Sequence, residues 1–206
     1  MKRNLLIACT SVAFIFASCG ESKPETPKAP ITALTGDAKL TVDPSASKVA
    51  WEGTMLGLYS HSGLVTLKSG TVSLKDGKVM GGSFVIDMNS ITPTDGNYTE
   101  PDGHTAANLV GHLSSPDFFD TASSPEASFV ITSVNGNTVN GNLTVRGKTN
   151  PEALEISTVA LEGENVKLNG TLKFDRQKYG VAFSMPVKDK VLSDEIAMNI
   201  ELVGKK

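Results

Sequence analysis

IAMNIELV, residues 196–203, has the clearest β-strand pattern in this chain. Ile196, Met198, Ile200 and Leu202 recur at every second position, and the residues between them are mixed in polarity. Because side chains i and i+2 point to the same face of a β-strand, this spacing predicts a strand with one apolar face. Such a strand packs against an apolar interior with that face.

The same alternation recurs upstream, in segments separated by turn-forming residues. Phe84, Ile86 and Met88 share one side of a predicted strand, and Phe129 and Ile131 repeat the arrangement. Glycine and asparagine tolerate the backbone angles of tight turns. The turns that they predict separate about eight strands. Turns are predicted at Ser69-Gly70, Asp76-Gly77, Asn135-Gly136-Asn137 and near Gly163.

The segment from Thr92 to Pro125 breaks this alternation. A polar loop up to His104 is followed by apolar residues at helical spacing, which predict a short amphipathic helix from about Thr105 to Leu113. Asp102 or a neighbouring residue is expected to begin it. The predicted fold class is therefore all-β: a single antiparallel eight-stranded barrel with a short helical cap, closed so that no strand edge stays unpaired.

The interior of such a barrel can be organised in two ways. Eight strands enclose a space that side chains just fill or that holds one small ligand. Gly82, Gly141 and Gly170 lie among the predicted strands, and glycine either leaves volume unfilled or eases the coiling of a strand. Both interiors stay open at this point.

The N-terminus has the features of an export signal. Lys2 and Arg3 precede an apolar run from Leu5 to Phe16, which as a helix reaches about 18 Å and is too short to span a membrane. The run ends in Phe16-Ala17-Ser18-Cys19, which resembles the lipobox of bacterial lipoproteins, although Phe16 stands where leucine is usual. We expect a lipoprotein signal peptide over residues 1–18 and a lipidated Cys19. The alternative is an ordinary signal with an incidental cysteine.

The composition of the rest of the chain fits one exported domain. Residues 19–38 are rich in proline and predict an extended tether, so the folded domain is expected over 39–206. The chain has two cysteines, of which Cys9 would leave with the signal, so the mature domain would hold no disulfide. The formal net charge of −3 gives no basic surface for a nucleic acid.

Several segments, in this order and spacing, resemble the YceI family of bacterial lipid-binding proteins. They are GGSFVIDMNSI (81–91), HLSSPDFFDTASSPEASFVIT (112–132), NGNLTVRGKTNP (140–151), NGTLKFDRQKYGV (169–181) and the terminal IAMNIELVG. The resemblance implies an extended lipocalin-like barrel around an apolar tunnel that holds a polyisoprenoid or another long-chain amphiphile. It implies no enzyme activity and no cofactor.

The residues predicted to contact such a ligand are those of the inward strand phase. They are Trp51, Phe84, Ile86, Met88, Phe129, Ile131, Leu143, Leu172, Phe174, Ile196, Met198 and Ile200. Arg176 shares that phase near a strand end, and a buried guanidinium must be paired. We expect Asp117 or Asp120 as its partner. In the alternative, Arg176, Lys148 and Tyr179 contact an anionic head group of the ligand.

Other candidate sites are weaker. His61, His104 and His112 are the only histidines, and their spacing predicts no metal site. No Gly-x-Ser-x-Gly motif presents a nucleophile, and no catalytic residue is assigned. Of the adjacent Phe118 and Phe119, one is expected to fill the barrel end as core, and the role of the other stays open.

Two functions from different classes remain. The first is carriage or sequestration of a long-chain lipid in the bacterial cell envelope, by a protein held to the membrane, by resemblance the outer one, through its acyl anchor. The second is a side-chain-filled interaction module that presents the loop Thr92–His104 to an envelope partner. A homodimer stays open, because the sequence does not define the oligomeric state.

Overall fold

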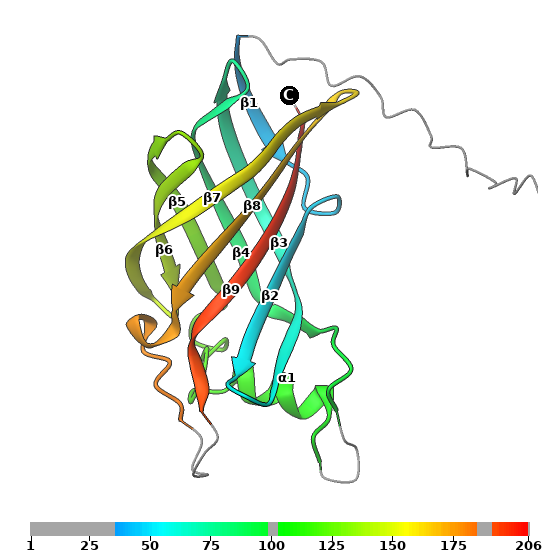
Figure 1. Ribbon diagram of the computed structural model, residues 1–206, viewed down its shortest axis with the longest axis vertical. Coiled ribbons are helices and arrows are strands. Elements are labelled where there is room, and N and C mark those ends of the chain that lie inside the picture. The colour runs from blue at the N-terminus through cyan, green and yellow to red at the C-terminus, as the bar shows by residue number, and fades with distance from the viewer. Residues whose placement is uncertain (1–35, 99–102, 185–190, 206) are drawn as a thin grey trace, which may run out of the picture.

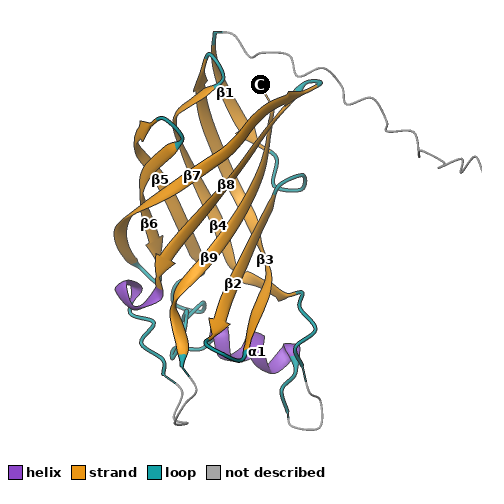
Figure 2. Ribbon diagram, viewed as in Figure 1, coloured by secondary structure: helices purple, strands orange, loops and turns teal. Residues whose placement is uncertain are grey.

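The computed structural model describes residues 36–98, 103–184 and 191–205, and these form mainly β-strands (Figure 1, Figure 2). The predicted signal peptide, Cys19 and nearly all of the tether lie outside the described residues. The first strand begins two residues before the expected start of the domain at residue 39. The strands are β1 (Asp37–Val42), β2 (Lys48–Met55), β3 (Tyr59–Lys75), β4 (Lys78–Pro93), β5 (Glu126–Asn135), β6 (Thr138–Val145), β7 (Lys148–Glu162), β8 (Asn165–Asp175) and β9 (Leu192–Lys205).

The strands close into a barrel with eight positions around its axis. Consecutive strands from β2 to β9 pair antiparallel, and β2 also pairs with β9. β1 and β2 share one position, because each lies between β3 and β9: Leu40 is opposite Val72, and Val49 is opposite Val65. The nine strands of the described residues therefore form an eight-stranded antiparallel barrel, which confirms the predicted fold class.

The turn expected at Ser69-Gly70 is wrong, because β3 continues through both residues. The strand has a β-bulge there, with a register shift between Leu67 and Ser69. Small residues favour bulges as well as turns, so the same residue types can belong to either structure. β3 and β4 are consequently the long strands of a single hairpin (Figure 1).

The other predicted turns are confirmed. Asp76 and Gly77 join β3 to β4 with φ angles of 47° and 74°, as a two-residue turn of type I′ requires. The turn at Asn135-Gly136-Asn137 joins β5 to β6, and the turn at Gly163 joins β7 to β8.

The expected helix is α1 (Ala106–Ser114), which lies at one end of the barrel near β4 (Figure 1). Thr105 is its N-cap: the hydroxyl accepts a hydrogen bond from the backbone N–H of Asn108 at 3.1 Å. Asp102, the residue named as the expected start, lies outside the described residues. A short 3-10 helix, η2 (Arg176–Tyr179), follows β8 at the same end. Neither described helix is long and apolar enough to cross a membrane.

The barrel end away from α1 is packed by its own side chains. Leu40, Val72, Val139 and Val166 are all at most 1% exposed, and they come from four strands that meet at this end (Figure 1). Branched aliphatic side chains fill the interior of an eight-stranded barrel efficiently. The end that carries α1 is built differently, and the candidate site lies there.

Candidate functional site

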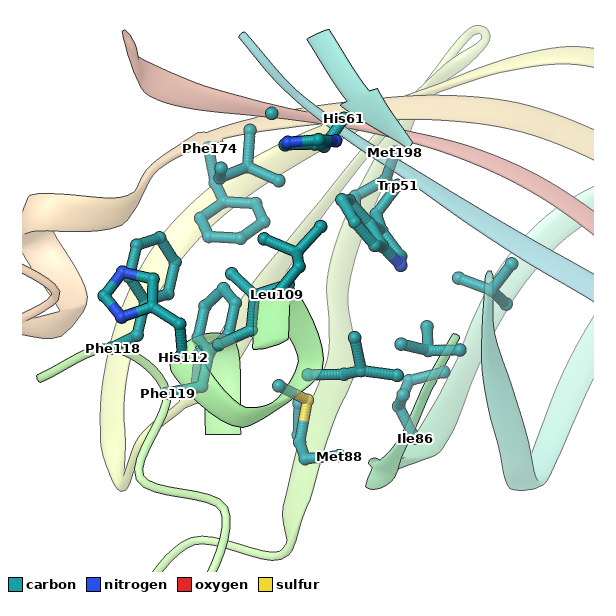
Figure 3. Close-up of a pocket in the computed structure, with 18 of the residues that line it drawn as sticks. Trp51, His61, Ile86, Met88, Leu109, His112, Phe118, Phe119, Phe174 and Met198 are labelled. Atoms are coloured by element: carbon teal, nitrogen blue, oxygen red, sulfur yellow. The ribbon is translucent and has the colours of Figure 1, made fainter. Parts of the chain in front are cut away.

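The barrel encloses a cavity of about 470 Å³ in its half nearer to α1 (Figure 3). Its lining is overwhelmingly apolar and comes from the inward faces of most strands, from α1 and from the segments that follow α1 and η2. A largely apolar concave site of this size is typical of a small-molecule ligand site. The interior is therefore hollow in this half and is not filled by the barrel's own side chains.

Nearly all of the predicted ligand contacts lie around this cavity. The predicted residues that line it are Trp51, Phe84, Ile86, Met88, Phe129, Leu143, Leu172, Phe174, Ile196, Met198 and Ile200. Ile131 lies elsewhere, beside a void of about 40 Å³ nearer the packed end. The structure thus groups the inward strand phase as expected, and contact with a ligand stays a prediction.

The cavity also has lining residues that the strand pattern did not identify. Leu109 and His112 project from α1, and Phe118 and Phe119 come from the loop that follows it (Figure 3). Phe183 lines the cavity from the segment after η2. The helical spacing around Leu109 and the adjacent phenylalanines were visible in the sequence. Where these segments lie depends on how the chain folds back over the barrel end, which strand periodicity does not report.

Phe118 is a core residue, 4% exposed, as expected for one of the two adjacent phenylalanines, and both rings also line the cavity. Their centroids are 4.9 Å apart at an interplanar angle of 76°, an edge-to-face contact that favours a fixed geometry. The pair forms part of the wall at the helical end.

Aromatic rings pressed against glycines help to keep the interior hollow. Trp51 lies opposite Gly63 on β3, and a Cβ at Gly63 would be 2.6 Å from the indole Cζ2. Because Gly63 has no side chain, the indole can lie close to the wall rather than fill the centre. Phe84 lies opposite Gly70 in the same way, but at the boundary between the cavity and a void of about 40 Å³.

The polar part of the lining includes His61, Tyr98 and Asn108 and lies at the α1 end. The Asp95 carboxylate is held beside His61, with Oδ1 3.2 Å from Nδ1, and accepts the backbone N–H of Ser62 at 2.9 Å. The Tyr98 hydroxyl also donates to Asp95 at 2.9 Å, and the Tyr98 ring stacks on His61.

Asp95 is ionised in this arrangement. Its partial burial acts to raise its pKa, but the hydrogen bonds from two backbone N–H groups and from His61 and Tyr98 outweigh this and lower the pKa to about 2. Burial and the neighbouring Asp95 raise the pKa of Tyr98 to about 12. Because a carboxylate only accepts hydrogen bonds, His61 must donate its Nδ1–H to it. In a neutral His61, Nε2 is then a hydrogen-bond acceptor.

The fold brings all three histidines of the sequence, His61, His104 and His112, to the lining of one cavity. Sequence spacing gave no sign of this, because they come from β3, a loop and α1. Within residues 36–98, 103–184 and 191–205, no three His, Cys, Asp or Glu side chains are grouped as a metal site would require.

Arg176 is buried, as expected, but its predicted partner is wrong. The guanidinium is 2.9 Å from Asp194 at the start of β9, not paired with Asp117 or Asp120. It also donates to the carbonyl oxygens of Val181, Phe183 and Ser193. Val181 and Phe183 follow η2, and Ser193 is in β9. Burial lowers the pKa of Arg176, and Asp194 opposes that effect. The sequence could not place residue 194, which reaches Arg176 only through the pairing of β8 with β9.

The three residues considered for an anionic head group do not line the cavity. Arg176 is occupied by the contacts above, and Lys148 is exposed at the start of β7. Tyr179 is fully buried, and its hydroxyl donates to Glu152 at 3.1 Å. Burial and the nearby Glu152 raise the pKa of Tyr179. Arg176 and Tyr179 thus connect η2 to β9 and β7, respectively.

Comparisons with known proteins agree with this architecture. Residues 40–204 match the family model described as the YceI-like domain. A UPF0312 protein of Shewanella putrefaciens is 26% identical over 196 residues, which cover 90% of this chain and 91% of that protein. A UPF0312 protein of Staphylococcus epidermidis is 33% identical over 85 residues; the match covers 37% of this chain and about half, 48%, of the relative.

Solved structures show the same fold. BcnA of Burkholderia cenocepacia superposes with a TM-score of 0.62 at 23% identity, over 79% of this chain and 98% of that one. A polyisoprenoid binding domain from Saccharophagus degradans, implicated in plant cell wall breakdown, superposes with a TM-score of 0.53 at 13% identity, over 81% and 97%.

Proposed function

The chain belongs to the YceI-like domain family, and on that basis we propose that its barrel holds the apolar chain of a long amphiphilic lipid, isoprenoid-like or fatty, without catalysing a reaction. The observation that carries the proposal is the apolar cavity of about 470 Å³. Burial of an alkyl chain is favourable by about 0.8 kcal/mol per methylene, so an apolar lining is sufficient to hold it. The Saccharophagus degradans domain, named for polyisoprenoid binding, supports the isoprenoid class by its shared fold.

The distribution of polar groups supports one orientation of the lipid. Aliphatic side chains close the barrel end away from α1, whereas His61, Tyr98 and Asn108 line the cavity at the α1 end. A polar head group buried without a hydrogen-bond partner is costly. The tail of the lipid therefore points toward the packed end, and its head group lies near α1.

The cellular role in this proposal is carriage or sequestration of the lipid in the bacterial envelope. It is supported by the signal-like N-terminus and by Cys19 in a lipobox-like context. The acyl chains would hold the protein to a membrane, the outer one in our proposal, and the proline-rich segment would separate the barrel from it. Cys19→Ser should release the protein into the soluble envelope fraction. If that variant partitions with membranes as the wild type does, the proposed lipid anchor at Cys19 is wrong.

The lipid-binding proposal is tested by filling the cavity. Met88 and Met198 line it from two strands, and Met88→Trp and Met198→Trp add bulk to the space that the lipid would occupy. Met80 on β4 is 57% exposed and is not among the lining residues, so Met80→Trp is the matched control.

Lipid co-purifying with each variant is extracted and counted per protein. We expect the two cavity variants to lose most of the lipid and the control to retain the wild-type amount. Equal lipid in all four proteins would show that the lipid, if any, is bound elsewhere.

A further inference from the structure

Two hollow spaces in the described part of the barrel, the large cavity and the 40 Å³ void, share lining residues. Phe84 and Phe129 line both the large cavity and the 40 Å³ void beyond it, so their rings lie at the boundary between the two. They are directly opposite each other on β4 and β5, and Leu154 on β7 and Ile200 and Leu202 on β9 line both spaces too. We call these five residues the floor of the cavity.

Two glycines hold the aromatic part of the floor in place. A Cβ at Gly70 would lie 2.7 Å from Cδ1 of Phe84, and a Cβ at Gly141 would overlap the ring of Phe129. Each ring therefore occupies a niche that a larger residue would close. A ring fixed in a niche by close packing moves less readily than one in an open space. The positions of both rings at the floor are therefore fixed by the packing of the neighbouring strands.

The floor limits the length of chain that the cavity accepts. An apolar cavity of 150 Å³ holds one benzene, which corresponds to roughly 25 Å³ per carbon atom. At that density the 470 Å³ cavity holds about 19 carbon atoms, and the 40 Å³ void adds fewer than about two.

We propose that the Phe84–Phe129 floor sets the ligand class, restricting this protein to single-chain lipids with about 15 to 20 carbons in the tail, such as C15 and C20 prenyl or C16 and C18 acyl chains. This inference rests on the proposed lipid-binding function. Prenyl chains of 40 carbons or more exceed the space in front of the floor. Replacing one phenylalanine by alanine removes six carbons and joins the void to the cavity, so Phe129→Ala should lengthen the accepted tail by about eight carbons.

The protein carries its own probe for this test. Trp51 is the single tryptophan of the sequence and lines the cavity. The full chain, stripped of bound lipid, is titrated with prenyl alcohols of increasing length (C10, C15, C20, C30 and C45) while Trp51 fluorescence is followed. Ile131→Ala is the matched control, because Ile131 borders the void but not the large cavity.

For the wild type, affinity should rise about fourfold with each added carbon that is buried, and it should stop rising near C20. Phe129→Ala should move this limit toward C30, and Ile131→Ala should leave it at C20. Ile200→Phe, which adds bulk at the floor, should move the limit below C20 and serves as the test if Phe129→Ala does not fold.

Binding of the C45 alcohol as tightly as the C20 alcohol by the wild type would overturn the length limit while leaving lipid binding intact. An unchanged limit in folded Phe129→Ala or Ile200→Phe would overturn the role of the floor. Failure of every prenyl alcohol and of C16 and C18 fatty alcohols to bind would instead overturn the proposed function.

Discussion

Arg176→Leu is expected to destabilise the fold strongly. The guanidinium is 2% exposed and donates to the carbonyl oxygens of Val181 and Phe183 at 2.7 and 2.8 Å. Val181 is fully buried, so its carbonyl has no access to water when Arg176 is removed. A buried polar group left without a partner costs about 1–3 kcal/mol.

The two sides of the Arg176–Asp194 ion pair differ in exposure. Asp194 is 49% exposed, so it remains hydrated whether or not Arg176 is present. Asp194→Asn keeps an oxygen acceptor, and the guanidinium keeps its backbone carbonyls, so this variant should cost about 1 kcal/mol. Arg176→Leu leaves the carbonyls of Val181 and Phe183 without their donor and should cost about 2–6 kcal/mol.

Urea unfolding followed by circular dichroism measures both free energies of unfolding. We expect Asp194→Asn to cost less than Arg176→Leu. Equal costs for the two variants would show that the ion pair, and not the backbone carbonyls, carries the stabilisation.

Three further predictions concern the Asp95 carboxylate, the N-cap of α1 and the contact of Gly141 with Phe129. Because hydrogen bonds lower the pKa of Asp95 from 3.8 to about 2, this carboxylate should contribute about 2 kcal/mol above pH 4 and lose that contribution as the pH falls through 2; Asp95→Asn should abolish this part of the pH dependence of unfolding. Thr105→Ala removes the N-cap of α1 and should cost about 1 kcal/mol in urea unfolding, most of which Thr105→Ser should recover. Gly141→Ala places a methyl group against the Phe129 ring and should cost about 1–3 kcal/mol. Gly81→Ala, with no atom within 4 Å of its Cβ, should be close to neutral, and equal costs for the two alanines would contradict the niche.

The barrel could be predicted from the sequence because each strand carries its own signal. The alternation around Met198 and Phe84 identifies the inward face of a strand without knowledge of its partner. The Asp76-Gly77 pair fixes a hairpin through its backbone angles alone. The turn predicted at Ser69-Gly70 was wrong for a physical reason. Gly70 leaves room for the Phe84 ring of the neighbouring strand β4, and the residues around Gly70 give no sign of that contact.

The site needed the three-dimensional fold wherever distant segments meet. Arg176 and Asp194 are joined by the pairing of β8 with β9, and His61 meets Asp95 because the segment after β4 returns to the start of β3. Sequence periodicity also could not decide between a filled and a hollow barrel. That outcome depends on how the Trp51, Phe84 and Phe129 rings lie against glycines.

Native mass spectrometry of the protein purified from its own envelope can show whether the barrel holds a lipid. We expect one bound lipid per barrel, released intact on collisional activation, with a tail of about 15 to 20 carbons. A protein that carries no lipid, and whose mass does not change after incubation with envelope lipids, would contradict this expectation. The cavity would then have to serve something other than lipid binding.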